Sequence, residues 1–156
     1  MTPVPEVANL GVVRPPLVYL AAIVIGLVLG FAWPIAFLPP GFATPVGSAL
    51  VLIAAMLFFY STAEFRAAGT PVPGNRPTTA IVSTGPYRYS RNPIYVAFTV
   101  VQTGLAAWTN ELWMIATLVA AVALIGTVVI PREEKYLEGK FGNEYLGYKA
   151  TVRRWI

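Results

Sequence analysis

The sequence contains no cysteine and no histidine. Their absence excludes disulfides, thiolate nucleophiles, zinc sites built from cysteine and histidine, and any imidazole base, and no metal site is predicted. Charged residues are also scarce, at 12% of the 156 residues, whereas hydrophobic residues make up 56%. A soluble domain carries about twice that share of charge. The chain is therefore predicted to be an integral membrane protein.

Four apolar stretches approach the roughly 20 residues that a helix needs to cross a bilayer. They cover residues 17–38, 46–65, 94–108 and 112–130. The third is the shortest, and it reaches across only with Pro93 in its first turn or with local thinning of the bilayer. A re-entrant segment is the alternative, but the short polar run between the third and fourth stretches favours a tight turn between antiparallel helices. The prediction is an all-α bundle of four transmembrane helices in a single domain, 1–156.

The 11 Lys and Arg residues all fall on one side of this four-helix map. One precedes the first span, four lie between the second and third, and six follow the fourth. The positive-inside rule therefore predicts that both termini are cytoplasmic. The basic face is expected to attract anionic membrane lipids, and no nucleic-acid motif accompanies it. No basic residue precedes Arg14, so a cleaved signal peptide is not expected.

The first span contains Gly26 and Gly30, a spacing that lets helices approach closely. Packing against another helix of the same chain is favoured, and the spacing also leaves room for a homodimer. Pro34 is expected to kink the far end of this span.

The connection between the second and third spans, residues 67–92, is long for a simple link and contains four prolines and three glycines. Long loops without secondary structure are usually functional or disordered. This one ends in the stretch GPYRYSRNPIY, from Gly85 to Tyr95, which is too aromatic for ordinary disorder. We therefore predict a binding loop at the cytoplasmic surface.

After the fourth span, residues 131–156 form a C-terminal cap. Its apolar side chains recur at helical spacing, and charged residues occupy the opposite face. The cap is predicted to be an amphipathic helix that lies on the membrane surface or covers the mouth of the bundle. Gly139, Gly142 and Gly147 weaken it and allow it to break into two short helices.

A tight turn between the third and fourth helices places the start of one beside the end of the other. The arginines and tyrosines of the loop should then meet Glu133 and Glu134. Such a pocket suits a ligand with a carboxylate, an ammonium, a ribose diol and an aromatic base, all of which S-adenosylmethionine carries. Its sulfonium would also be attracted to tyrosine faces. In the structural alternative, these arginines and tyrosines anchor the interface, and the glutamates are favoured by the helix dipole.

Two motifs in these segments resemble the isoprenylcysteine carboxyl methyltransferase and phospholipid methyltransferase group of integral-membrane enzymes. The first is matched by Tyr87, Arg91, Asn92, Pro93 and Tyr95. The second is matched by Glu133, Glu134, Leu137, Phe141, Gly142, Tyr145 and Tyr148. The resemblance covers roughly the C-terminal half of the chain.

This resemblance implies that S-adenosylmethionine binds between the helical hairpin and the C-terminal helix. The methyl acceptor would be a lipophilic molecule that enters between helices, such as a prenylcysteine-like carboxylate, a lipid amine or a thiol. The cofactor-binding residues implied are Tyr87, Arg91, Asn92, Pro93, Tyr95, Glu133 and Glu134. Arg88 and Arg91 are the candidate catalytic residues, with Arg88 expected to face the acceptor.

The chain departs from the family pattern at two positions. Asn92 stands where many members have histidine, and Ala97 where many have glycine. Asparagine can still bind the cofactor through hydrogen bonds, but it cannot transfer a proton.

Two rival interpretations remain open at this point. The chain could be a membrane scaffold or lipid-binding protein that shares the fold without the chemistry. It could also be a nicotinamide-dependent enzyme resembling sterol reductases, although it is short for one.

Overall fold

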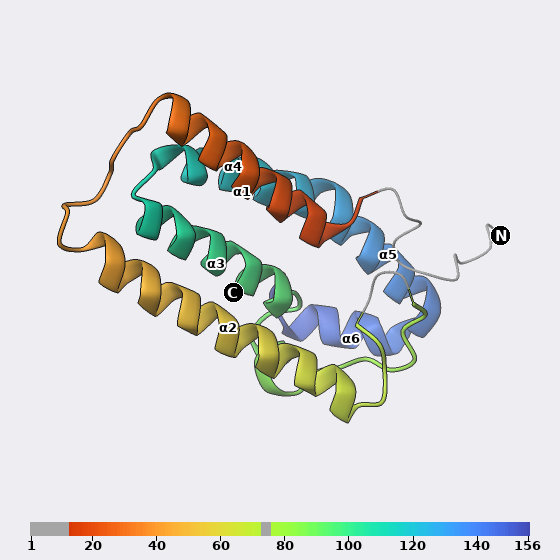
Figure 1. The fold of residues 1–156 in the computed structure, drawn as a ribbon. Coiled ribbons are helices and arrows are strands. Elements are labelled where there is room, and N and C mark those ends of the chain that lie inside the picture. Colours follow the sequence, from red (N-terminus) through yellow and green to blue (C-terminus); the bar gives the residue numbers. More distant parts are fainter. Residues whose placement is uncertain (1–12, 73–75) are drawn as a thin grey trace.

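The computed structural model describes residues 13–72 and 76–156, and within them every regular element is a helix (Figure 1). Four helices run side by side: α1 (Pro15–Ala32), α2 (Ala43–Ala67), α3 (Pro93–Thr109) and α4 (Leu112–Leu124). The last two helices, α5 (Ile130–Phe141) and α6 (Asn143–Thr151), lie at one end of the bundle. The all-α helical bundle predicted from the sequence is confirmed.

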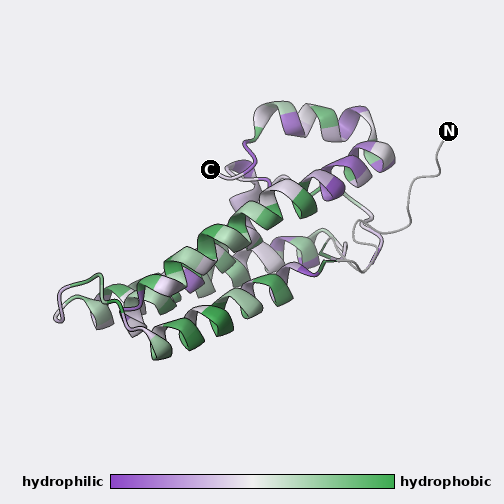
Figure 2. Ribbon diagram, turned by 90° about the horizontal axis from the view of Figure 1, so that it is seen from above, coloured by the Kyte–Doolittle hydropathy of each residue, from purple (hydrophilic) through white to green (hydrophobic). Residues whose placement is uncertain are grey.

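Three helices in the described residues are long and apolar enough to cross a membrane: Pro15–Ala32, Ala43–Ala67 and the continuous helix Leu112–Phe141. Apolar residues dominate the bundle, whereas the α5–α6 end is more polar (Figure 2). Helix α3 has 17 residues, which rise about 25 Å. That length is short of a full bilayer core. That α3 crosses the membrane, and that both termini are cytoplasmic, remain predictions.

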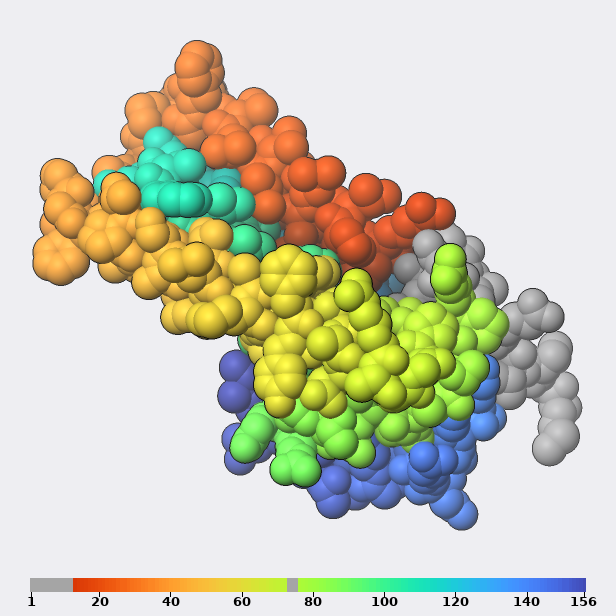
Figure 3. All heavy atoms as spheres, turned by 60° about the horizontal axis from the view of Figure 1, so that its bottom comes forward, coloured from red at the N-terminus to blue at the C-terminus, as the bar shows by residue number. Residues whose placement is uncertain are grey.

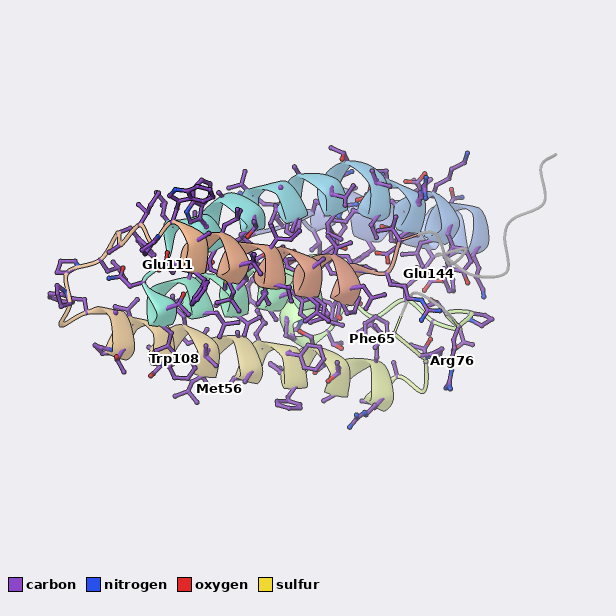
Figure 4. All side chains as sticks on the ribbon, turned by 45° about the horizontal axis from the view of Figure 1, so that its top comes forward. Met56, Phe65, Arg76, Trp108, Glu111 and Glu144 are labelled. Carbon is purple, nitrogen blue, oxygen red and sulfur yellow. The ribbon has the colours of Figure 1, made fainter. Side chains whose placement is uncertain are left out.

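The two ends of the bundle differ in what connects the helices. At one end, which we call the turn end, the short α3–α4 turn lies beside Trp108 and Glu111 (Figure 4). At the other, which we call the loop end, Phe65, Arg76 and Glu144 lie with the α2–α3 connection and the C-terminal helices (Figure 4).

Asn110 stabilises the turn end, and its backbone adopts the left-handed conformation with φ +52°. Its side-chain oxygen accepts hydrogen bonds from the backbone N–H groups of Phe37 and Leu38 at 3.0 and 2.8 Å. Its side-chain nitrogen donates to the Leu38 carbonyl at 2.9 Å. The tight turn predicted between antiparallel helices is therefore confirmed, and it also holds the α1–α2 connection.

Helix α1 ends earlier than predicted. The expected span reached residue 38 with a kink at Pro34, but the helix stops at Ala32. Proline disfavours the helical conformation in the residue before it, and Trp33 leaves the helix with φ −140° and ψ 82°. Pro34 therefore ends the helix, and the prediction of a kinked span was wrong.

Glycines bring the helices into close contact within the chain. A Cβ at Gly26 would lie 2.8 Å from Met114 Sδ, and one at Gly30 would lie 2.9 Å from the Glu111 side chain, so Gly26 faces α4 and Gly30 faces the residue that precedes it. This confirms the favoured interpretation of their spacing. Gly47 and Gly104 likewise allow α2 and α3 to pack closely, since a Cβ at Gly47 would lie 2.8 Å from the Gly104 carbonyl oxygen.

Helix α4 continues into α5 through a single wider turn, the π-helical segment Ile125–Val129. Here the Ile130 N–H bonds to the carbonyl of Ile125, five residues earlier. The cause is Pro131, which has no N–H and whose ring crowds the carbonyl four residues before it. The cap helix therefore continues from the fourth helix and does not start at residue 131.

The cap breaks at Gly142, whose φ of +54° lies in a region that favours glycine. This break confirms that the C-terminal segment forms two short helices.

We predict that Gly47→Ala destabilises the protein by about 1 to 3 kcal/mol, because the added methyl overpacks α2 against α3. Its nearest obstacles include backbone atoms of Gly104 and Trp108, at 2.8 and 2.9 Å. The matched control is Gly41→Ala, which would meet nothing within 4 Å. Thermal unfolding of both variants in detergent checks this, and equal midpoints would contradict it.

Candidate functional site

A cavity of about 590 Å³ lies at the loop end of the bundle. It is lined by the start of α1, the second half of α2, the α2–α3 connection, the start of α3, and helices α5 and α6. In Figure 3 the connection after α2 lies against the C-terminal helices. The cap therefore covers the mouth of the bundle, one of the two arrangements predicted for it.

One polar group in the cavity is the carboxylate of Glu133, which is only 7% exposed. The Tyr95 hydroxyl donates a hydrogen bond of 2.6 Å to Glu133 Oε1. Among the described residues Glu133 forms no ion pair. The predicted meeting of the start of α3 with the segment after α4 is thus observed.

The neighbouring carboxylate, Glu134, is held by cations of the chain itself. Arg154 donates to both of its oxygens, with Nε 3.0 Å from Oε1 and Nη2 2.7 Å from Oε2. Lys149 Nζ lies 3.6 Å from Oε2, and Arg91 Nη1 lies 3.2 Å from Oε1. Glu134 lines the cavity, but its oxygens are already engaged.

The Arg91 guanidinium in the cavity wall has two buried nitrogens that make no hydrogen bond among the described residues. Its side chain is 10% exposed. Although Nη1 approaches Glu134, neither Nη1 nor Nε has a partner in hydrogen-bonding geometry among the described residues. Buried donors without partners are costly, so these two atoms are suited to an anionic group that enters the cavity.

Three tyrosines complete the polar end: Tyr87, Tyr145 and Tyr148. The Tyr148 hydroxyl donates to the Tyr87 carbonyl at 2.8 Å, which ties α6 to the loop. Burial raises the pKa of Tyr87, and it raises the pKa of Tyr145 to about 12, helped by the charge of Glu134 and opposed by Arg91. All three phenols are therefore neutral near pH 7, since burial also raises the pKa of Tyr148.

The chain after α6 pairs with the segment that carries Arg91. The Arg91 N–H donates to the Arg153 carbonyl at 2.9 Å, and the Asn92 side-chain nitrogen donates to the Arg154 carbonyl at 2.8 Å. In the sequence, Arg153 and Arg154 contribute only to the distribution of basic residues that predicts the membrane topology. Nothing in the spacing links Arg154 to Glu134, 20 residues earlier, so sequence reasoning missed this partner.

Two predicted site residues lie outside the cavity lining. Pro93 is buried in the first turn of α3, where it helps to start the helix. Arg88 is exposed at the end of the short 3₁₀ helix Gly85–Arg88, next to the buried Tyr87. Consecutive residues of such a turn point in different directions. Because Tyr87 points inward, the structure does not bring Arg88 into the site.

Comparison with known proteins then decides the family. Residues 42–144 match the sequence model of the family described as phospholipid methyltransferase. The chain belongs to this family. The match includes the loop, Arg91 and the paired glutamates, and it ends before Tyr145 and the C-terminal segment. The family is one of membrane methyltransferases, which indicates this general reaction class.

Individual relatives cover smaller parts of the chain. An uncharacterized protein of Haemophilus influenzae is 46% identical over 57 residues, 33% of this chain and 87% of that protein. A nickel-cobalt-cadmium resistance protein of Alcaligenes xylosoxydans xylosoxydans and a cobalt-zinc-cadmium resistance protein of Cupriavidus metallidurans are 39% and 36% identical over 66 residues. That stretch is 42% of this chain and 31% of each of those two proteins. No solved structure matches the chain.

We predict that Tyr95→Phe destabilises the protein by about 1 to 3 kcal/mol, because a buried carboxylate oxygen loses its donor. The matched control is Tyr89→Phe, at a tyrosine that is 75% exposed. Thermal unfolding in detergent measures the difference, and a Tyr95 variant as stable as the Tyr89 variant would refute the prediction.

Proposed function

We propose that the protein transfers a methyl group from S-adenosylmethionine to a lipophilic acceptor. The observation that carries this proposal is that two buried Arg91 nitrogens, Nε and Nη1, make no hydrogen bond among the described residues, in the wall of a cavity that also holds Glu133. The family supplies the reaction class, and the chemistry of the cavity supports the methyl donor.

The groups at the polar end match the parts of this donor. Arg91 can bind its carboxylate through charge-assisted hydrogen bonds. Glu133, oriented by Tyr95, can accept hydrogen bonds from the ammonium group or the ribose hydroxyls. The rings of Tyr87 and Tyr148 offer faces for the sulfonium and the base.

The remaining predicted cofactor residues act on the donor through their neighbours. Asn92 uses its side-chain nitrogen to hold the Arg154 carbonyl. Pro93 starts α3 and so fixes the direction in which Tyr95 projects. Glu134 serves as the counter-ion of the surrounding cations.

When bound, S-adenosylmethionine supplies a methyl group on a positively charged sulfur, and the carbon–sulfur bond breaks as the acceptor's nucleophile bonds to that carbon. The electron pair of the broken bond stays on sulfur. The chain contributes by holding the donor's carboxylate at Arg91 and by excluding water with apolar walls. No histidine is needed for this contribution.

The acceptor would use the apolar part of the cavity, which is lined by Leu17 of α1, Phe58 and Phe65 of α2, and Ile94 and Phe98 of α3. Helix α1 packs mainly on α4, and α2 packs on α3. Leu17 is itself 56% exposed, and we propose that the acceptor enters the cavity beside α1. A prenylcysteine-like carboxylate, a lipid amine or a thiol could each enter there with its tail in the membrane.

The test is calorimetric titration of S-adenosylmethionine into the protein purified in detergent. We expect saturable binding that Arg91→Ala weakens about tenfold to a hundredfold, the worth of a charge-assisted hydrogen bond. Arg88→Ala is the matched control, because this arginine is three residues away and exposed, and it should leave the affinity unchanged.

The same titration separates the rival functions. Absence of S-adenosylmethionine binding to the folded wild type would overturn the proposal and favour a scaffold of the same fold. Binding of a nicotinamide dinucleotide in its place would favour the reductase interpretation.

A further inference from the structure

Arg154 lies beyond the part of the chain that matches the family model, in the segment that follows α6. Its side chain is 39% exposed and spans from the surface to the buried carboxylate of Glu134. The two hydrogen bonds, at 3.0 and 2.7 Å, engage one oxygen each. This is the parallel geometry in which a guanidinium binds a carboxylate most strongly.

The position of Arg154 limits the contacts that Arg91 makes with Glu134. Without Arg154, both oxygens of Glu134 would be open to a bidentate pair with Arg91, whose Nη1 already lies 3.2 Å from Oε1. With Arg154 in place, Arg91 keeps only the single ion-pair contact of Nη1 with Oε1, and neither Nε nor Nη1 makes a hydrogen bond among the described residues. The guanidinium of Arg91 is thereby kept available.

The backbone of the same segment fixes Arg91 from a second direction. The Arg153 carbonyl accepts from the Arg91 N–H, and the Arg154 carbonyl accepts from the Asn92 side chain. The segment after α6 therefore contacts both the main chain of Arg91 and the counter-ion beside it.

We propose that Arg154 is a positioning residue, which occupies Glu134 and so leaves Arg91 free to bind the carboxylate of the methyl donor. This inference rests on the proposed function. It makes Glu134 an internal counter-ion and the C-terminal segment a required part of the donor site.

The test compares two ligands that differ in the group Arg91 would bind. S-adenosylhomocysteine carries the carboxylate, whereas 5′-methylthioadenosine lacks the whole amino-acid part. We expect Arg154→Ala to weaken S-adenosylhomocysteine about tenfold, within the range of coupling in one ion-pair network. The affinity for 5′-methylthioadenosine should stay within about twofold. Arg153→Ala, which changes the exposed neighbouring side chain, should alter neither affinity.

A double variant distinguishes positioning from a merely structural role. If Arg154 acts by keeping Glu134 away from Arg91, then Glu134→Gln added to Arg154→Ala should restore much of the lost affinity for S-adenosylhomocysteine. Equal losses for both ligands, with no restoration, would overturn the inference. If the alanine variant does not fold, Arg154→Lys keeps the charge without the two-pronged geometry and should show the same carboxylate-specific loss, only smaller.

The two proposals fail differently. If the wild type binds no S-adenosylhomocysteine, the proposed function itself is wrong. If the wild type binds it and Arg154→Ala binds it equally well, only the role of Arg154 is wrong.

Discussion

Two adjacent buried carboxylates, Glu133 and Glu134, impose the constraint on which the loop end of this protein depends. A buried carboxyl group needs hydrogen-bond donors, and a partner of opposite charge stabilises it further when it is ionised. Glu133 is satisfied by the hydroxyl of Tyr95, and Glu134 by the guanidinium of Arg154 with help from Lys149. These partners come from α3, from α6 and from the chain after it, so the hydrogen bonds and ion pairs of the two carboxyl groups connect the elements of the loop end.

The arrangement of the helices places the partners of Glu133 and Glu134 close to them. The short turn at Asn110 sets α3 and α4 antiparallel, and the glycine contacts let α1 and α2 pack closely on them. The π-helical turn before Pro131 then adds one residue to a single turn of the long helix. Such an insertion rotates everything after it by about 100°. It therefore helps to decide which face of α5 carries the glutamates toward the cavity.

The resulting cavity has a charged, aromatic end and an apolar end. A polar methyl donor and a lipophilic acceptor need these two environments side by side, and a membrane methyltransferase must provide both. The family match covers the residues of the charged end up to the start of α6. Lys149 of α6 and Arg154 of the segment after it add cations that contact Glu134, so the electrostatics of the site depend on a part of the chain outside that match.

The sequence by itself determined the helices, the α3–α4 turn, the break in the cap and most of the residues that line the cavity's polar end. These features follow from local rules: apolar runs, the effect of proline and glycine on neighbouring backbone, and motifs within a few residues. Even so, local reasoning misjudged Pro34, which ends α1 rather than kinking it.

Only the tertiary structure decided that Arg88 faces outward while Tyr87 faces the cavity, and that Arg154 is the partner of Glu134. An ion pair depends on where the folded chain brings two charges together, and sequence spacing does not encode that distance.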